Sequence, residues 1–393
     1  MDFSIIKATL VDIPDILNIY YRVYKNDYPL SIGTNPDEIK DALLSPDRYL
    51  WLIAKDTTNQ NKSIGSIIFH FDKCSRTGKV MGVAVMPGYQ GRGIAGLLIS
   101  KGTQILLEQE NDIDALYTTT RTVSVASQLM FLKNGYYSLG IFPNAHKIHA
   151  FETLTFMGCF RKNVLENRQY IYTISPKLKP LLKISNRILG KKRCLSQKKN
   201  ESVCVTYDLK FSPVENDFEF VLAPQFVKKR FQKTFPKEFR DKEFTPFEAP
   251  NLLITATESD FELYAHLSQK DHYCAIIGTN QEIEELGANN LKRLIFKMKD
   301  YGINYIEVLI RLDNDKAINC FLENQFLPSA ICPAFKQEDN QYMDFIFLSR
   351  TMQPLDFSGM QVSENFKGYI DQYVKSWIDM HVSSLEVVGD KKN

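Results

Sequence analysis

The sequence predicts a mixed α/β (α+β) fold made of two similar units, each a mixed twisted sheet flanked by helices. Three observations predict this fold class. Segments with strand and helix periodicity alternate along most of the 393 residues. A glycine-punctuated junction near residue 90 joins an apolar strand to a helix. Residues 121–145 resemble residues 311–335, 190 positions later, without a gap.

The first half of the chain contains this alternation in a clear form. Apolar residues at helical spacing, such as Leu10, Ile13 and Leu17, predict helices, and short apolar runs bounded by turn residues predict strands. In chain order we expect a strand at 3–8, helices at 9–24 and 36–44, strands at 49–55, 63–71 and 79–86, a helix at 91–110, a strand at 115–119, a helix at 124–133 and strands within 140–156.

The internal repeat is visible residue by residue. Its identical pairs include Arg121 with Arg311, Phe131 with Phe321, Leu132 with Leu322, Asn134 with Asn324, Ile141 with Ile331 and Pro143 with Pro333. The flanks agree as well, because a strand expected at 305–310 matches residues 115–120 and a helix expected at 283–301 matches residues 94–110. The pattern indicates a tandem duplication of one α/β unit.

The repeat and the changes in composition divide the chain into four parts. We expect a first unit at 1–162, a basic connector at 163–200, a second unit at 201–352 and a tail at 353–393. The tail contains a predicted helix at 364–380 with Phe366, Tyr369, Tyr373 and Trp377 along one face. A stripe of this kind more often docks on its own protein than on a partner.

Composition excludes several classes of protein. The formal net charge of +2 gives no overall attraction to nucleic acid. The seven cysteines are odd in number, scattered and never arranged as CxxC, which argues for a reducing compartment and against a disulfide framework or a structural zinc site. No apolar run approaches the roughly 18 residues that span a bilayer, and the N-terminus does not resemble a secretion signal. We therefore expect a cytoplasmic protein without an integral membrane segment, a metal or a nucleic-acid partner.

The basic connector allows two interpretations. Lysines and arginines between Lys177 and Lys199 alternate with leucines and isoleucines, so an amphipathic basic helix lying on an anionic surface is one reading. A solvated connector between units is the favoured one, because such charge runs are commonly solvated. A nucleic-acid or membrane adaptor acting through this segment is the least favoured function.

The segment VMGVAVMPGYQGRGIAGLLISKG carries the chemistry. N–H groups at the start of a helix point outward and, with the helix dipole, favour a diphosphate. Gly91, Gly93 and Ala95 keep side chains away from the main chain, and Arg92 adds positive charge at the rim. Taken alone, the pattern is also typical of an ordinary strand-to-helix turn.

In its wider context this segment resembles a known family. The pattern Gln/Arg-x-x-Gly-x-Gly/Ala follows a strand that ends near Val85 and precedes a helix. The opening IKATLVDIPDILNIY, the order of elements through residue 160 and the later Lys133-Asn134-Gly135-Tyr136 are similar too. The first unit thereby resembles the GNAT superfamily of acyl-CoA N-acyltransferases, and the whole chain resembles a tandem GNAT-like repeat.

The resemblance implies a site and a reaction. It assigns the CoA pyrophosphate to the loop, and the pantetheine to the main chain of the preceding strand, where one N–H polarises the thioester carbonyl. It also implies acetyl-CoA or another acyl-CoA as co-substrate, direct attack by an amine of a small molecule or protein, and no metal. The residues so implied are Gln90, Gly91, Arg92, Gly93, Ile94 and Ala95 in the loop, Val83, Ala84 and Val85 in the strand, and Ser124 where the family's later helix often starts with Asn.

The chain departs from the family at the acid and the base. Phe131 stands where a tyrosine general acid is common, and the polar residue of the strand is Lys79, where many relatives have glutamate. His70 is a candidate base, since its ordinary pKa is near neutrality, and Tyr136 or Tyr137 is a candidate proton donor. Structural roles are the commoner reading of all three, and exposure is the commoner reading of the polar cluster His146, His149 and Glu152. The acid and the base stay open.

At the equivalent loop of the second unit the sequence is GTNQEIEELGANN. Carboxylates of Glu282, Glu284 and Glu285 would repel a diphosphate there, so we read residues 245–350 as a degenerate copy. The leading function is transfer of an acetyl or other short acyl group to an amine. The alternative is a non-catalytic acyl-CoA-binding regulatory module.

Overall fold

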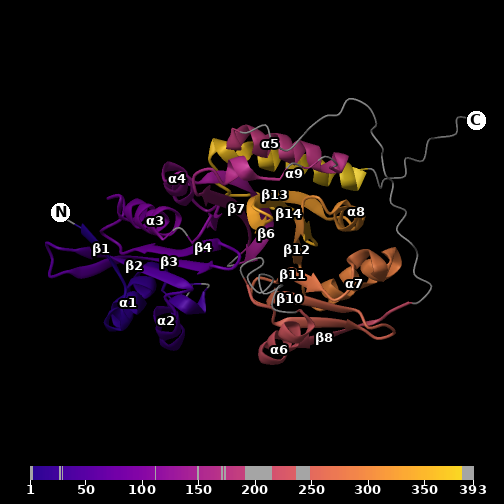
Figure 1. Cartoon of the computed structure of the whole chain (residues 1–393), viewed down its shortest axis with the longest axis horizontal. Coiled ribbons are helices and arrows are strands. Elements are labelled where there is room, and N and C mark those ends of the chain that lie inside the picture. Colours follow the sequence, from indigo (N-terminus) through magenta and orange to yellow (C-terminus); the bar gives the residue numbers. More distant parts are fainter. Residues whose placement is uncertain are drawn as a thin grey trace, which may run out of the picture.

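One continuous sheet runs through the computed structural model (Figure 1). The structure describes residues 3–25, 28, 30–110, 112–147, 150–169, 171, 174–190, 215–235 and 248–382. Within them, fourteen strands lie in the order β1-β2-β3-β4-β5-β7-β6-β13-β14-β12-β11-β10-β9-β8. Pairs β4–β5 and β11–β12 are parallel and the other named pairs are antiparallel. The mixed α/β fold class is therefore confirmed.

The strand bounds are β1 Phe3–Lys7, β2 Tyr49–Asp56, β3 Lys62–Asp72, β4 Thr77–Val85, β5 Ala115–Arg121, β6 Tyr137–Lys147, β7 Phe151–Phe160, β8 Phe218–Leu222, β9 Leu252–Ala256, β10 Glu262–Ser268, β11 Tyr273–Thr279, β12 Tyr305–Arg311, β13 Leu327–Glu338 and β14 Gln341–Thr351. The helices are α1 Ile13–Tyr24, α2 Pro36–Leu43, α3 Ile94–Gln104, α4 Val125–Lys133, α5 Lys179–Leu189, α6 Pro224–Thr234, α7 Ala288–Asp300, α8 Asp315–Glu323 and α9 Glu364–Val382.

Local sequence explains where the helices begin. Asn35 caps α2 by accepting a hydrogen bond from Asp37 N at 3.0 Å, and Pro36 occupies the first helical position. The helix expected from residue 91 begins only at Ile94, because Gly91 and Gly93 have φ of 76° and 79°. The helix expected from residue 9 begins with a 3₁₀ turn at Leu10–Asp12.

The strand order is the same when it is read inward from either edge of the sheet. The first half, β1-β2-β3-β4-β5-β7-β6, corresponds strand by strand to the second half, β8-β9-β10-β11-β12-β14-β13. The halves meet in an antiparallel β6–β13 contact that places Gly140 opposite Ala330.

Helices cover both faces of the first half (Figure 1). On one face α3 buries Leu98 and Ile99 in a core shared with Val80 of β4. On the other face α1 buries Ile16 and Ile19 with residues of β2 and β3. The C-terminal end of β4, which continues into the glycine-rich loop, thus lies between α3 on one face of the sheet and α1 on the other.

The predicted tail helix is present as α9, and it packs beside α5 over β6 and β13 (Figure 1). Phe366, Tyr369 and Tyr373 are buried, and Tyr369 Oη donates to Ser138 O at 3.0 Å. Helix α5 buries Leu181 and Leu182 in the same core. Its apolar face is therefore covered by the protein, which argues against an amphipathic membrane-surface helix in the described part of the basic connector; residues 191–199 lie outside the described residues.

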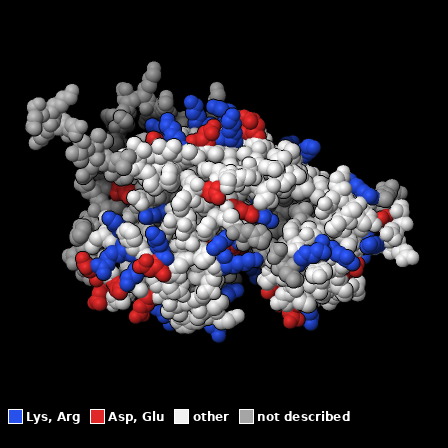
Figure 2. Space-filling view, turned by 180° about the vertical axis from the view of Figure 1, so that it is seen from behind, with Lys and Arg blue, Asp and Glu red and all other residues white. Residues whose placement is uncertain are grey.

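Two further observations concern the charge of one face and the hydropathy of the helices. Figure 2 shows Lys and Arg mixed with Asp and Glu over the face seen from behind. Among the described residues, every helix is too short or too polar to cross a membrane.

Candidate functional site

Strands β4 and β5 are paired at one end and apart at the other. Their parallel register pairs are Thr77 with Ala115, Gly78 with Leu116 and Lys79 with Tyr117. The two strands separate after the Lys79–Tyr117 pair, and we call this point the fork. There the hydroxyl of Thr118 donates to Val80 O at 2.9 Å. Beyond it, the main chain of β4 from Met81 to Val85 has no register partner on β5. Strand edges of this kind offer N–H and C=O groups to an extended ligand.

A β-bulge shapes the open part of β4. Its register with β3 shifts between Ser66 and Ile68, opposite Gly82, which has φ of +66°. A Cβ at Gly82 would lie 2.5 Å from Tyr20 Oη, so glycine is required there for steric as well as conformational reasons. Tyr20 Oη donates to Gly82 O at 2.6 Å, and Tyr24 Oη donates to Val83 O at 3.1 Å. Two tyrosines of α1 thus fix the carbonyl groups of the open strand.

The glycine-rich loop leaves its main chain accessible. A Cβ added at Gly91 or Gly93 would have no neighbour within 4 Å. The first helical hydrogen bond of α3 runs from Leu97 N to Gly93 O at 3.0 Å, so the N–H groups just before it have no acceptor within the helix.

Side chains hold the ends of this loop in place. Gln90 Nε2 donates to Val85 O at 3.1 Å, and the Arg92 guanidinium lies 5.3 Å from the Tyr89 ring centroid. Ile94 is buried. The loop therefore presents N–H groups and one arginine toward solvent at the open end of β4.

An ion pair stands at the end of β5. Arg121 donates to both carboxylate oxygens of Glu152, at 2.8 and 2.7 Å. Burial raises the pKa of Tyr24, and the charge of Arg121 partly offsets that rise. Tyr24, Arg121 and Glu152 therefore lie near one another beside the open strands. Sequence reasoning missed this grouping, although Arg121 stood in the internal repeat and Glu152 in the polar cluster.

His70 lies at the paired end of the fork. It is the register partner of Lys79, and its ring stacks on Tyr49 with centroids 4.4 Å apart. Burial lowers its pKa to about 4, with further lowering by the charges of Arg48 and Lys79. Lys79 itself forms an ion pair with Glu248 at 3.1 Å.

The two candidate tyrosines lie elsewhere. Tyr136 is buried; its hydroxyl is 3.0 Å from Thr103 Oγ1 under α3, its ring packs edge-on against Phe131, and burial raises its pKa. Tyr137 starts β6 and is partly exposed. The structure does not bring His70 close to these tyrosines, because β4, β5 and β7 lie between β3 and β6.

The remaining predicted polar residues have identifiable partners. Ser124 caps α4 by accepting a hydrogen bond from Ala126 N at 3.2 Å. His146 Nδ1 lies 2.8 Å from Asp271 Oδ1, a contact between the two halves. Burial raises the pKa of Asp271, but hydrogen bonds from His146, Lys147 N and Ser268 outweigh it and lower the pKa to about 2. His149 lies outside the described residues.

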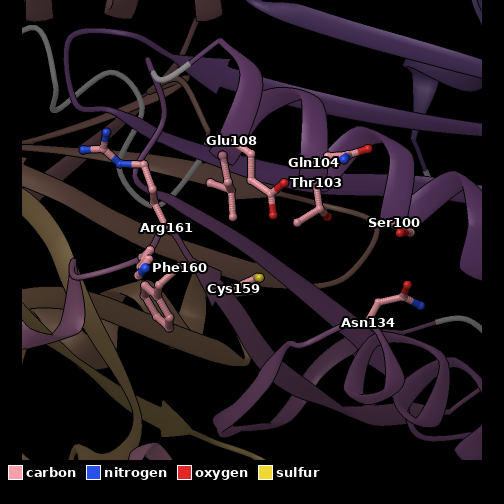
Figure 3. Close-up of a pocket in the computed structure, with 10 residues that line it drawn as sticks. Ser100, Thr103, Gln104, Glu108, Asn134, Cys159, Phe160 and Arg161 are labelled. Carbon is pink, nitrogen blue, oxygen red and sulfur yellow. The ribbon is translucent and has the colours of Figure 1, made fainter.

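A pocket of about 530 Å³ lies at the other end of α3 (Figure 3). Ser100, Thr103 and Gln104 line it from α3, and Asn134 and Cys159 face them from the ends of α4 and β7. The glycine-rich loop precedes α3, whereas this pocket follows its C-terminal half. The pocket is therefore separate from the open end of β4. Among the described residues there is no group of three His, Cys, Asp or Glu side chains placed to hold a metal.

The equivalent turn of the second half has a different character. A 3₁₀ turn at Ile283–Leu286 separates β11 from α7, and Glu282 and Glu285 are exposed there. Gly287, with φ of 82°, precedes α7 as Gly93 precedes α3, but the residues before it include Glu282, Glu284 and Glu285. Their carboxylates disfavour an anion.

Comparisons with known proteins concern the first half. Residues 11–136 match the model of the Acetyltransferase (GNAT) family. The resemblance found in the sequence is therefore confirmed for this region, which is about a third of the chain. No curated protein matches the chain.

Solved structures of N-acetyltransferases cover a similar share. A spermidine N-acetyltransferase mutant from Vibrio cholerae is 14% identical, with a TM-score of 0.36 over 41% of this chain and 96% of its own. The ribosomal-protein-S18-alanine N-acetyltransferase from Escherichia coli is 17% identical, with a TM-score of 0.34 over 40% and 94%. A Thermoplasma acidophilum N-acetyltransferase in complex with coenzyme A is 13% identical, with a TM-score of 0.32 over 41% and 99%.

Proposed function

We propose that the first half of the chain binds acyl-CoA and transfers its acetyl or other short acyl group to an amine. The observation that carries this proposal is the fork of β4 and β5 beside a left-handed glycine loop at the start of α3. The loop N–H groups from Gln90 to Ala95 suit a diphosphate. The main chain at Val83, Ala84 and Val85 has no register partner on β5 and suits the amide groups of a pantetheine arm, with the carbonyl groups of Val83 and Val85 already accepting from Tyr24 and Gln90. We also assign Ser124, the N-cap of α4, to this site, as the family resemblance implies.

The reaction needs no covalent enzyme intermediate. The amine nitrogen attacks the thioester carbonyl carbon, the C–S bond breaks, the thiolate leaves and takes up a proton, and the amine loses one. A main-chain N–H of the open strand stabilises the negative charge that develops on the carbonyl oxygen. Strands β4, β5 and β7 lie between His70 on β3 and Tyr137 on β6, so we assign no proton acceptor or donor to this group of residues.

The acceptor belongs beside the open strand, where Tyr24, Arg121 and Glu152 meet. Glu152 supplies negative charge and Arg121 positive charge at this edge. An amine-bearing small molecule and a protein amino group both remain acceptors under this proposal, and acetyl-CoA is the acyl donor.

We also propose that the chain arose by tandem duplication, with a first unit at 1–162, a connector at 163–200, a degenerate second unit at 201–352 and a tail at 353–393. The matching strand order of the two halves supports this. Gly140 and Ala330, which lie opposite each other at the junction, are 190 positions apart, the same spacing as the sequence repeat, so equivalent positions of the two units meet there. The carboxylates of Glu282 and Glu285 support loss of acyl-CoA binding in the second unit.

A non-catalytic acyl-CoA-binding regulatory module is the second candidate. Phe131 favours it, because this buried ring packs against Tyr136 and has no proton to donate to a leaving thiolate. This candidate requires binding of acyl-CoA without release of thiol in the presence of amines.

Calorimetric titration with acetyl-CoA tests the binding step. Gly93→Glu introduces a carboxylate into the loop, and Gly359→Glu is the matched control, since Gly359 also has a left-handed φ, of 70°, and open space around it. We expect one site per chain, lost in Gly93→Glu and kept in Gly359→Glu. No heat from the unaltered protein, or equal binding by both variants, would refute the site. Thiol release with a panel of amines then separates the enzyme from the binding module.

A further inference from the structure

A second pocket, of about 380 Å³, lies in the second half of the molecule. One wall is α7, another is the end of β14 with the turn to Pro354, and the third is α9. This pocket corresponds to the pocket of the first half shown in Figure 3. Thr351 of β14 lines the second pocket and pairs with Tyr305 of β12. Phe160 of β7 lines the first pocket and pairs with Ala115 of β5 in the same way.

The lining of this second pocket is basic. It includes Lys299, Arg350 and His381 and contains no Asp or Glu. The equivalent pocket of the first half differs, since it contains Glu108, and its Arg161 forms an ion pair with Asp114 at 2.6 Å. The second pocket therefore carries the positive charges of Lys299 and Arg350 without a carboxylate in its own lining.

Arg350 is the most informative of these residues. Its Nη1 donates to Asn324 O at 2.7 Å, at the end of α8. Among the described residues it forms no ion pair within 4.0 Å, and burial lowers its pKa. The hydrogen bond to Asn324 O at the end of α8 uses one N–H donor of the Arg350 guanidinium. A guanidinium has five such donors in a fixed planar arrangement. This arrangement matches the two oxygens of a carboxylate or phosphate.

The rest of the pocket is apolar and aromatic. Ile295 is buried, and Trp377 and Met352 are half-buried. Phe296 is 51% exposed at the rim, although it is a large apolar side chain. Trp377 is held in place by His381, whose ring centroid lies 4.0 Å away and whose Nδ1 donates to Trp377 O at 2.8 Å. Flat aromatic walls of this kind stack on rings.

We propose that this pocket binds a small ligand made of a flat apolar ring and an anionic group, a carboxylate or a phosphate. The anionic group pairs with Arg350 and the ring packs between Trp377 and Phe296. This site lies outside the acyl-CoA site proposed above, and its binding does not depend on that site.

Fluorescence offers a direct test, because the chain has two tryptophans. Trp51 is buried in the first half and bonded to Ser66, so Trp51→Phe leaves Trp377 as the reporter. Phenylacetate and phenyl phosphate are titrated against the full chain, with phenylacetamide and acetate as probes that lack the charge or the ring. We expect saturable quenching by one or both ring-bearing anions at millimolar concentration or below, and weaker binding of the other two probes.

Two substitutions locate the binding. Arg350→Gln keeps a donor for Asn324 O but removes the charge, and the affinity for the ring-bearing anion is expected to fall at least about tenfold. Arg293→Gln on α7 is the matched control, since Arg293 is exposed and pairs with Glu215 outside the pocket. If Arg350→Gln unfolds, Lys299→Gln and Phe296→Ser, both at exposed positions, take its place, with weaker binding expected from each. Absence of quenching, equal binding of phenylacetamide, or unchanged affinity in these variants would overturn the proposal.

Discussion

Gly140 of β6 and Ala330 of β13 lie opposite each other where the two halves of the sheet meet. A Cβ at Gly140 would lie 2.3 Å from both Cα and Cβ of Ala330 and 2.4 Å from Ser329 O. Because two of these atoms are main-chain atoms, the contact cannot be relieved by rotating a side chain. The side chain missing at position 140 is thus what allows the halves to approach.

Gly140→Ala is therefore expected to lower the free energy of unfolding by about 1–3 kcal/mol, the usual cost of overpacking a tight contact. Urea unfolding followed by circular dichroism measures it. Gly368→Ala in α9 is the control, since its added methyl meets Ile184 Cγ2 at 3.5 Å, an ordinary contact, and alanine favours the helix. Equal stability of Gly140→Ala and the unaltered protein would show that the junction is looser than this geometry requires.

A buried ion pair ties the segment after β7 to the second half. Arg168 Nη1 lies 2.9 Å from Asp344 Oδ2, and both side chains are 1% exposed. Asp344 Oδ1 also accepts a hydrogen bond from Ala334 N at 2.9 Å. Arg168→Leu leaves this carboxylate buried without its cation, so we expect a loss of about 3–5 kcal/mol in the free energy of unfolding.

Arg311→Leu provides the comparison for the buried pair. Arg311 pairs with Glu338 at 2.7 Å and with Asp313 at 2.8 Å, but all three side chains are about a third or more exposed, so its removal is expected to cost about 1 kcal/mol or less. Thermal melts of both variants measure the difference. Similar losses in the two variants would contradict the role assigned to burial.

Most of the local structure could be predicted from the sequence. Glycines that need left-handed φ, such as Gly91 and Gly93, and caps such as Asn35 act over a few residues, so they are readable one segment at a time. The same holds for the tail helix, whose aromatic stripe has a helical period.

The parts that could not be predicted depend on contacts between distant segments. Tyr342 Oη donates to Asp114 at 2.8 Å across 228 positions of the chain, and nothing near either residue signals the other. The convergence of Tyr24, Arg121 and Glu152 arises in the same way, since it needs α1, β5 and β7 in their final places. For His70 the sequence predicted only part of the answer. The alternation of residues in β3 indicates which face of the sheet His70 lies on. Its position at the paired end of β4 and β5 depends on the register of β3 with β4, which the sequence of β3 alone does not contain.

The position of His70 leads to a kinetic prediction. Its ring stacks on Tyr49 at the paired end of the fork, and its pKa of about 4 keeps it neutral and weakly basic near pH 7. If the protein is an acyltransferase, His70→Gln should leave kcat/KM within about twofold, since removing a general base costs about 10²–10⁴-fold. The pH–rate profiles of both proteins should coincide. A hundredfold loss, or a shifted acidic limb of the profile, would restore His70 as a base.

Glu307 on β12 makes stability depend on pH. Its carboxyl is 4% exposed, Tyr273 Oη donates to it at 2.6 Å and Tyr305 Oη at 3.1 Å, and burial raises its pKa to about 7 despite both hydrogen bonds. The unfolded chain releases this proton near the ordinary value of 4.5. Between these values the folded protein binds more protons than the unfolded one, so its free energy of unfolding falls as pH rises.

Glu307→Gln removes this titration while keeping a polar group beside both tyrosines. The stability of the unaltered protein, relative to the variant, should fall by up to about 3 kcal/mol as pH rises from 4.5 to above 7. Urea unfolding of both proteins on either side of this window measures the difference. Glu338→Gln, at an exposed carboxylate, should show no such change. A difference between the unaltered protein and Glu307→Gln that is the same at both pH values would mean that Glu307 is ionised in the folded protein throughout, with the Tyr273 and Tyr305 hydroxyls outweighing burial.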